Sequence, residues 1–279
     1  MTADKRPQTA LCTVSPIHLV TLSSPFMEAE KNSTMPNRTQ VFAHRGAKTV
    51  APENTLPAFQ KAIEMGAAGI ELDTQATADS HLVVLHDFRL ERTTTGSGLL
   101  REQTLAQLQG VDAGIRFHPA FAGTLIPTLE QLFDTVGDRC RVNVEIKNMD
   151  WDGGPEVDLL VPLIQRRKLH EQVIVSSFNP IALLKMRWAD PSIALGLLSS
   201  EELPLFLRRA WLGPLIAPEA LHPHHKMIDE EYMRWARSQG HYVNTWTVND
   251  PDEARRLAGL GVDVIMSDVP DVMMAAIGE

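Results

Sequence analysis

Cysteine is nearly absent from this chain of 279 residues, which has only Cys12 and Cys140. Two cysteines cannot build a disulfide framework or a thiolate zinc site, so we expect a reducing compartment and predict a cytoplasmic protein. A run of about 18 uncharged apolar residues, the minimum for a transmembrane helix, is also missing. We therefore expect no stable insertion into a membrane.

Positive charge is in deficit, because 26 Lys and Arg residues face 35 Asp and Glu residues and leave a net charge of −9. This balance argues against a protein that binds nucleic acid or an anionic membrane through a basic face. It leaves room for an anionic small substrate, which needs only a few local cations and a metal ion. With 44% apolar and 22% charged residues, the chain can bury a large core, and disorder throughout is excluded.

The N-terminal segment differs in character from the rest of the chain. Residues 10–27 are mildly apolar, but a proline, a histidine and several hydroxyl residues interrupt them, and no cleavage site of small residues follows, which disfavours a secretory signal. We predict a poorly ordered tail over residues 1–39 and one domain over residues 40–279. The sequence leaves open whether Met27 or Met35 is the true start.

Short apolar runs alternate with helical stretches along the predicted domain. Nine candidate strands are found, at residues 40–46, 69–75, 82–87, 141–147, 172–178, 193–199, 217–225, 242–248 and 262–268. Most are apolar on both faces, as parallel strands covered on both sides are. The alternation predicts an α/β fold with a parallel sheet, and a single eightfold barrel is compatible with this chain length. Because such a barrel needs eight strands, one of the nine lies outside it, and the sequence leaves open which one.

Residues 88–127 carry no strand pattern, and we predict a small insertion there, after the third strand, that covers one mouth of the barrel. The helices between the strands have clear start signals. Thr55 precedes an amphipathic stretch, and Thr128 with Gln131 fits a capping box. Asp250 before a proline fits an N-cap followed by a first helical residue.

Polar residues lie at the ends of these apolar strands, where α/β barrels carry their active sites. His44 and Arg45 end the first strand, and His86 ends the third. Glu71 and Asp73 are two residues apart on the second strand, so both carboxylates project from the same face.

A third carboxylate, Glu145, lies on the strand at 141–147 and shares its face with Lys147. Inward carboxylates make a poor core unless a cation neutralises them. Glu71, Asp73 and Glu145 are hard oxygen donors without a cysteine among them, so we predict a site for Mg²⁺ or Ca²⁺. A solvated edge-strand face is the alternative for the pair on the second strand.

Two cations and two imidazoles accompany the predicted metal. Arg45 and Lys147 suit a phosphate, and His44 and His86 can exchange protons near neutral pH. Such a set indicates phosphodiester cleavage, in which one histidine deprotonates the attacking oxygen and the other protonates the leaving alkoxide. The alternatives are a structural ion pair between Arg45 and Glu53, and a role for Lys147 as the charge partner of a carboxylate.

At these residues the sequence resembles the glycerophosphodiester phosphodiesterases, a family of TIM barrels. The matching segments are AHRG (43–46), APENT (51–55), GIELD (69–73), LHD (85–87), RTTTGSG (92–98), IPTLEQL (126–132), NVEIK (143–147), SSF (176–178), TWTVN (245–249) and GVDVIMSD (261–268). They extend over about residues 41–271 in the family's order, with Ser267 where the family usually has threonine.

The resemblance implies a role for each matching position. The implied roles are acid and base for His44 and His86, metal ligands for Glu71, Asp73 and Glu145, and phosphate contacts for Arg45 and Lys147. Glu53 matches an acidic residue of the family, which we place at the metal or next to it. The insertion at 88–127 would contribute to the glycerol side of the substrate. Trp246 is a candidate substrate contact, although a tryptophan more often packs in a core.

We therefore predict metal-dependent hydrolysis of small-molecule glycerophosphodiesters to sn-glycerol 3-phosphate and an alcohol, as part of glycerol and lipid metabolism. Attack by water and attack through a cyclic phosphate both stay open, as does the oligomeric state. Two other functions are possible. An apolar mouth at 88–127 would favour a phosphodiesterase similar to lysophospholipase D, and a barrel that binds a phosphate metabolite without catalysis is the second alternative.

Three histidines, His222, His224 and His225, form a cluster late in the sequence. We interpret them as histidines of a surface loop rather than as a metal site, because no acidic or cysteine partner lies at ligand spacing in the sequence.

Overall fold

The computed structural model describes Pro25 and residues 38–203 and 212–278. The predicted tail over residues 1–39 lies almost entirely outside these described residues. The described strands form one sheet and are β1 (Gln40–His44), β2 (Gly69–Ala76), β3 (Leu82–Val84), β4 (Arg141–Ile146), β5 (Val173–Ser177), β6 (Ala194–Ser199), β7 (Ala220–Pro223), β8 (Tyr242–Thr245) and β9 (Val264–Ser267). Each coincides with one of the nine predicted strands.

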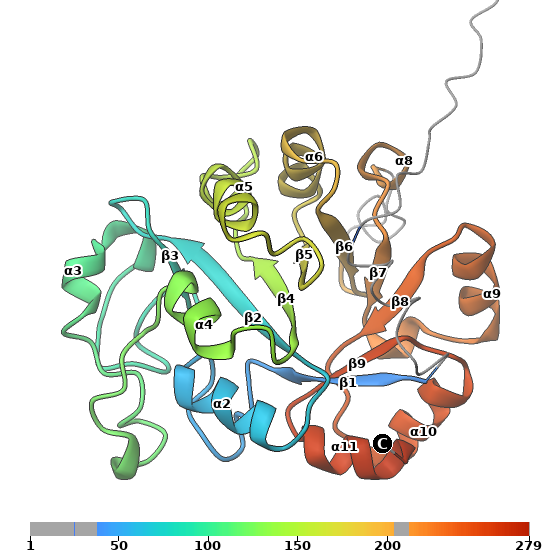
Figure 1. The fold of residues 1–279 in the computed structure, drawn as a ribbon, viewed down its shortest axis with the longest axis horizontal. Coiled ribbons are helices and arrows are strands. Elements are labelled where there is room, and N and C mark those ends of the chain that lie inside the picture. Colours follow the sequence, from blue (N-terminus) through green and yellow to red (C-terminus); the bar gives the residue numbers. More distant parts are fainter. Residues whose placement is uncertain (1–24, 26–37, 204–211, 279) are drawn as a thin grey trace, which may run out of the picture.

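Eight of these strands close into a parallel barrel, which confirms the predicted TIM barrel (Figure 1). The order is β1-β9-β8-β7-β6-β5-β4-β2, and β1 also pairs with β2 to close the ring. The strand outside the barrel is β3, which pairs antiparallel with β2. Residues 77–81 explain this pairing: a parallel connection needs a crossover of about a dozen residues, whereas these five form a hairpin.

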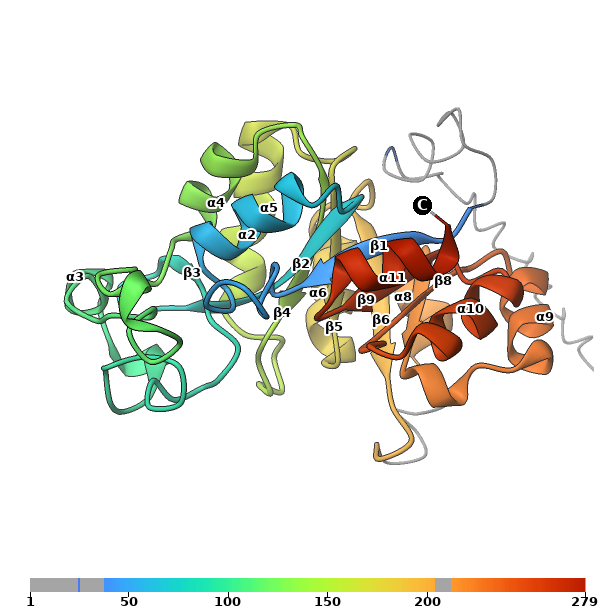
Figure 2. The same cartoon turned by 90° about the horizontal axis from the view of Figure 1, so that it is seen from below.

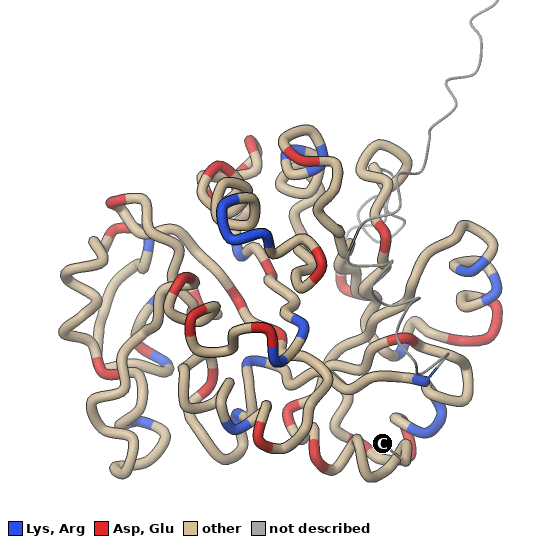
Figure 3. Tube along the Cα trace, in the orientation of Figure 1, with Lys and Arg blue, Asp and Glu red and all other residues tan. Residues whose placement is uncertain are grey.

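Helices surround the barrel on its outer side (Figures 1 and 2). The described helices outside the insertion are α2 (Leu56–Glu64), α4 (Leu129–Val136), α5 (Glu156–Arg167), α6 (Pro180–Ala189), α8 (Gly213–Ile216), α9 (Glu230–Ser238), α10 (Pro251–Gly259) and α11 (Pro270–Ile277), together with the 3₁₀ turn η3 (His225–Met227). None of the described helices combines the length and the apolar character needed to cross a bilayer. In Figure 3 acidic and basic residues are interspersed along the described chain rather than gathered into a basic face.

Two of the three predicted helix starts have the expected side-chain caps. Thr128 and Gln131 form a complete capping box at α4, and Asp250 accepts a hydrogen bond at the start of α10. Thr55 also occupies an N-cap position, at α2, but its side chain does not cap the helix. Its hydroxyl instead donates to the carbonyl oxygen of Pro52 at 2.6 Å, within the loop that leads from β1.

Alternation along β2 decides which side chains reach the inside of the barrel. Ile70 and Leu72 are fully buried in the main core between barrel and helices. Glu71 and Asp73 must therefore point the other way, into the barrel, because successive side chains of a strand lie on opposite faces.

The insertion at residues 88–127 lies beside the barrel, next to β3 (Figure 1). It holds the 3₁₀ turns η1 (Leu100–Glu102) and η2 (Pro119–Phe121) and the short helix α3 (Leu105–Leu108). A small apolar cluster, separate from the main core, stabilises it and joins Leu90, Leu100 and Leu108 to Val83 of β3.

Candidate active site

Three carboxylates converge inside the barrel near the carboxyl ends of its strands. Asp73 of β2 lies directly opposite Glu145 of β4, and Glu71 lies opposite His44 of β1. One oxygen from each of Glu71, Asp73 and Glu145 lies within 4.8 Å of the others. All three side chains are buried, so the predicted alternative of a solvated edge-strand face is wrong.

Burial and mutual repulsion disfavour the ionised form of two of the three carboxylates. Burial, together with repulsion from Asp73 and Glu145, raises the pKa of Glu71 well above its usual range. Burial also raises the pKa of Glu145. Burial opposes ionisation of Asp73 too, but attraction to Lys147 and Arg45 lowers its pKa. Three buried oxygen donors, two of which resist ionisation by themselves, suit a bound Mg²⁺ or Ca²⁺.

Both predicted phosphate contacts lie at this cluster. The ammonium of Lys147 is 2.7 Å from an oxygen of Glu145 and 3.4 Å from one of Asp73. The guanidinium of Arg45 is 3.3 Å from Asp73 through Nε and 3.0 Å from Glu53 through Nη1. The ion pairs anticipated as alternatives, Arg45 with Glu53 and Lys147 with a carboxylate, are therefore both present, and they hold the two cations beside the cluster.

Residues with positive φ shape the loop that leads from β1 to α2. Arg45 has φ of 59°, in the left-handed region that a long side chain rarely adopts, and Asn54 has φ of 57°, which asparagine tolerates better than most residues. Gly46 has φ of 80°, and a Cβ there would lie 2.7 Å from the backbone of Ala58, so only glycine fits. The result is that Asn54 donates a 2.8 Å hydrogen bond to Asp73 and fixes one oxygen of the cluster.

His44 is oriented by Asp268, a carboxylate outside the predicted set of site residues. Its Nδ1 is 2.6 Å from Asp268, which follows β9, and its Nε2 is 3.9 Å from Glu71. Lys48 and Asn249 also contact Asp268, at 2.8 and 2.9 Å. Burial is the main reason that the pKa of His44 is lowered, and the hydrogen bond to Asp268 acts in the opposite direction. The sequence signal was present, since Asp268 ends an apolar strand as the other site residues do.

His86 has a similar arrangement on the insertion side. Its Nδ1 is 2.6 Å from the carboxylate of Asp87, and burial again lowers its pKa. Gln75 fixes the backbone here, because its Nε2 donates to the carbonyl oxygens of Leu85 at 2.7 Å and Asp87 at 2.9 Å.

Arg92 connects the two halves of the site. Its guanidinium donates to both carboxylate oxygens of Glu53, at 3.1 and 2.7 Å, and to both oxygens of Asp87. Glu53 contacts Arg45 in turn, and Asp87 contacts His86. Arg92, at the start of the insertion, thus ties a predicted phosphate contact to a predicted acid–base group.

Trp246 follows β8 and is half-buried. Its ring packs edge-on against Phe178 and His224, with centroids 5.4 and 5.3 Å apart. Its indole N–H donates to the carbonyl oxygen of His222 at 2.9 Å. The ring of Phe178 also lies 5.9 Å from the ammonium of Lys147, which brings this aromatic group to the edge of the site.

The interpretation of the histidine cluster as a surface loop is wrong for His222. This side chain is fully buried on β7, where it packs over Gly196 and bonds Asn244 at 2.9 Å. Acidic partners come from elsewhere in the sequence, because His224 is 3.1 Å from Glu201 and His225 is 2.7 Å from Glu253. The sequence could not supply these pairs, since their members lie on different βα units.

The family model described as "Glycerophosphoryl diester phosphodiesterase family" matches residues 44–272. The chain belongs to this family. It is 38% identical to a glycerophosphodiester phosphodiesterase of Caldanaerobacter subterraneus, over 85% of this chain and 97% of that one. It is 31% identical to a glycerophosphodiester phosphodiesterase of Bacillus subtilis, over 89% of this chain and 90% of that one.

A similar solved structure is the Oleispira antarctica phosphodiesterase in complex with the product sn-glycerol-3-phosphate. It superposes with a TM-score of 0.78 at 30% identity and covers 87% of this chain and 98% of its own. These similarities confirm the predicted family, fold and class of enzyme.

Proposed function

We propose that this enzyme hydrolyses glycerophosphodiesters to sn-glycerol 3-phosphate and an alcohol at the mouth formed by β1, β2 and β4. The observation that carries the proposal is the convergence of three buried carboxylates with two carboxylate-bound imidazoles and two cations. Product bound in the similar Oleispira structure supports the choice of substrate class. The near absence of cysteine favours the cytoplasm as its location.

Glu71, Asp73 and Glu145 would hold Mg²⁺ or Ca²⁺, which when bound supplies positive charge to the phosphoryl oxygens. Arg45 and Lys147 would add charge-assisted hydrogen bonds to the same oxygens, and these strengthen as the phosphorane charge develops. Both cations already lie within 3.5 Å of the carboxylate cluster, so little movement is needed to reach a phosphate there.

His44 and His86 would act as the acid–base pair. Each has Nδ1 bound to a carboxylate, Asp268 or Asp87, which fixes the ring and leaves Nε2 for proton transfer. One imidazole takes the proton of the attacking hydroxyl, and the other gives a proton to the leaving alkoxide. The same pair serves attack by water and attack by the glycerol 2-hydroxyl.

The test is release of glycerol 3-phosphate from glycerophosphocholine, with EDTA and after return of Mg²⁺ or Ca²⁺. Activity should disappear on chelation and return with metal. Glu145→Gln should lower kcat/KM more than 100-fold, a larger loss than the 10- to 100-fold typical of residues that only support metal ligands. The matched control is Glu130→Gln on the exposed face of α4, which should leave activity unchanged.

Lysophosphatidylcholine in a parallel assay separates the predicted alternative, a phosphodiesterase similar to lysophospholipase D. Preference for that substrate over glycerophosphocholine would replace our proposal with the alternative. Binding of glycerol 3-phosphate without turnover of either substrate would instead indicate a barrel that only binds. Full activity in excess EDTA, with no metal found by elemental analysis, would refute the metal site.

A further inference from the structure

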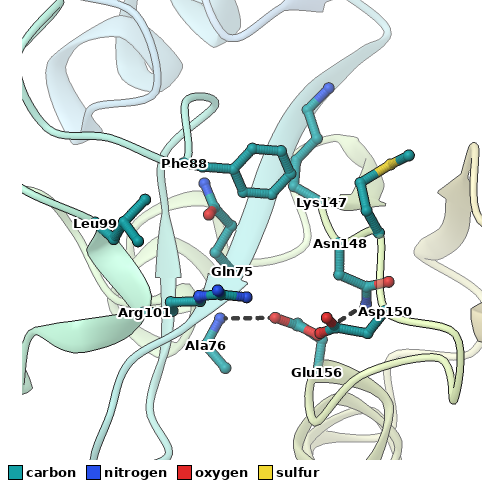
Figure 4. Close-up of a pocket in the computed structure, with 10 residues that line it drawn as sticks. Gln75, Ala76, Phe88, Leu99, Arg101, Lys147, Asn148, Asp150 and Glu156 are labelled. Carbon is teal, nitrogen blue, oxygen red and sulfur yellow. Dashed lines mark hydrogen bonds between the residues drawn. The ribbon is translucent and has the colours of Figure 1, made fainter.

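A pocket of about 330 Å³ opens beside the carboxylate cluster (Figure 4). Its walls come from the ends of β2 and β4, from the insertion and from the loop between β4 and α5. Lys147 forms part of the wall, so the pocket adjoins the position proposed for the phosphate. Pockets that bind small molecules begin at about 300 Å³, and this volume suits a polar headgroup better than a long acyl chain.

The pocket combines apolar walls with charges of both signs. Phe88 and Leu99 of the insertion contribute apolar surface. Two of the charged groups are already satisfied: Lys147 is paired with the carboxylate cluster, and both oxygens of Glu156 accept hydrogen bonds, from the backbone N–H of Ala76 at 3.1 Å and from Asn148 at 2.8 Å. Glu156 therefore lines the pocket but has no free carboxylate oxygen with which to bind a ligand.

Arg101 and Asp150 are the two charged groups of this pocket whose side chains form no hydrogen bond or ion pair within the described chain. They come from opposite walls, Arg101 from η1 and Asp150 from the loop after β4. An unpaired charged side chain in a pocket favours ligands that carry the opposite charge, because the two groups can form a charge-assisted hydrogen bond.

The backbone under each charge is fixed. Arg101 follows the fully buried Leu100, whose N–H donates to the carbonyl oxygen of Phe88 at 2.9 Å. The carbonyl oxygen of Asp150 accepts a 2.8 Å hydrogen bond from the side chain of Asn179. The two charges are thus presented from ordered segments, which lowers the entropy cost of binding a ligand between them.

We propose that this pocket receives the leaving alcohol and selects a headgroup that carries both a carboxylate and an ammonium group, as serine does. Arg101 binds the carboxylate of that headgroup and Asp150 binds its ammonium. This proposal rests on the proposed hydrolysis of glycerophosphodiesters and adds a preference for one headgroup among these substrates.

Other occupants satisfy the pocket less well. The family resemblance places the insertion on the glycerol side, but glycerol is a neutral triol and would leave both Arg101 and Asp150 without a charge partner. Ethanolamine and choline carry a cation alone and would leave Arg101 unpaired. A serine headgroup differs from ethanolamine by a single carboxylate. Comparing kcat/KM for these two substrates therefore isolates the contribution of Arg101 to substrate selectivity.

The experiment compares kcat/KM for glycerophosphoserine, glycerophosphoethanolamine and glycerophosphoglycerol in the metal-loaded enzyme. The wild type should prefer the serine substrate. Arg101→Gln should lower the ratio of serine to ethanolamine turnover by about 10- to 100-fold, the loss expected for a hydrogen bond between charged groups. The matched control is Arg89→Gln, an exposed arginine of the same insertion that pairs with Glu91, and it should leave the ratio unchanged.

Asp150→Asn should lower kcat/KM for the serine and ethanolamine substrates by a similar factor relative to glycerophosphoglycerol. An equal loss for all three substrates in Arg101→Gln would overturn the proposal and place glycerol or phosphate in the pocket. An unchanged ratio would overturn it as well. These outcomes differ from failure of the proposed function, which would appear as no turnover of any glycerophosphodiester by the metal-loaded wild type.

Discussion

Replacing Arg92 by glutamine should lower kcat/KM about 10- to 100-fold, although Arg92 lies outside the carboxylate cluster. The change removes the charge and four hydrogen bonds, two to Glu53 and two to Asp87. These carboxylates hold Arg45 and His86, so both the proposed phosphate contact and the proposed acid–base group lose their orientation. Supporting residues of this kind typically account for such a loss.

The cost in stability should be much smaller than the cost in catalysis. Arg92 is 48% exposed, and exposed ion pairs each contribute about 0.2–1 kcal/mol to the free energy of unfolding. With two carboxylate partners, the loss should be about 1 kcal/mol, which lowers Tm by about 2–4 °C in a domain of this size. A selective loss of activity therefore distinguishes positioning from unfolding.

The assay measures kcat, KM and Tm for Arg92→Gln beside the control Arg89→Gln. The dependence of kcat/KM on pH adds a second readout. Without Arg92, Asp87 is no longer held against His86, so the apparent pKa that His86 contributes to this profile should shift. Asp87→Asn combined with Arg92→Gln should lose less than the sum of the two single effects, since part of the effect of Arg92 passes through Asp87 to His86. A kcat/KM within twofold of wild type, or a loss that merely follows Tm, would refute the reasoning.

Three further predictions concern stability. Mg²⁺ or Ca²⁺ at about 100 times its Kd should stabilise the protein by roughly 3 kcal/mol, seen as a rise in Tm by differential scanning fluorimetry, and the lack of a rise with either ion would contradict the metal site. Gly196→Ala would put a Cβ 2.4 Å from the ring of His222, so urea unfolding should show a loss of about 1–3 kcal/mol that shrinks in a His222→Ala background. Burial opposes ionisation of Asp190, but hydrogen bonds from Ser192 and Gln165 lower its pKa. A lowered pKa in the folded state gives stability that is present above the unfolded value near 4 and is lost as pH falls through the folded value, so Asp190→Asn should cost about 1–2 kcal/mol at pH 7 and the difference should shrink below pH 4. Urea titrations at pH 7 and pH 3.5 measure this, and a pH-independent difference would contradict it.

The carboxylate cluster could be predicted because strand alternation is a local rule. Glu71 and Asp73 flank Leu72, and an apolar Leu72 in the outer core forces both carboxylates inward. The identity of the strand outside the barrel was also within reach, because residues 77–81 are too few for a parallel crossover. Apolar composition alone did not separate β3 from the barrel strands.

The supporting contacts could not be read from local patterns. Asp268 is 224 residues from His44, and Arg92 is 39 residues from Glu53, so each pair forms only after the barrel has closed. His222 was misjudged for a related reason. Pro223, His224 and His225 follow it, a composition typical of a loop, whereas its burial depends on the space left by Gly196 on the adjacent strand.

The separate apolar cluster of the insertion has a consequence for how this enzyme could diversify. Leu90, Leu100 and Leu108 pack with β3 and not with the helices around the barrel. Mutations in the insertion therefore affect only its own small apolar core, and the packing of the eight barrel strands is kept. Substrate preference can drift, or be exchanged by grafting residues 93–127 from a relative, while Arg92 and the proposed machinery for breaking the phosphodiester bond are kept.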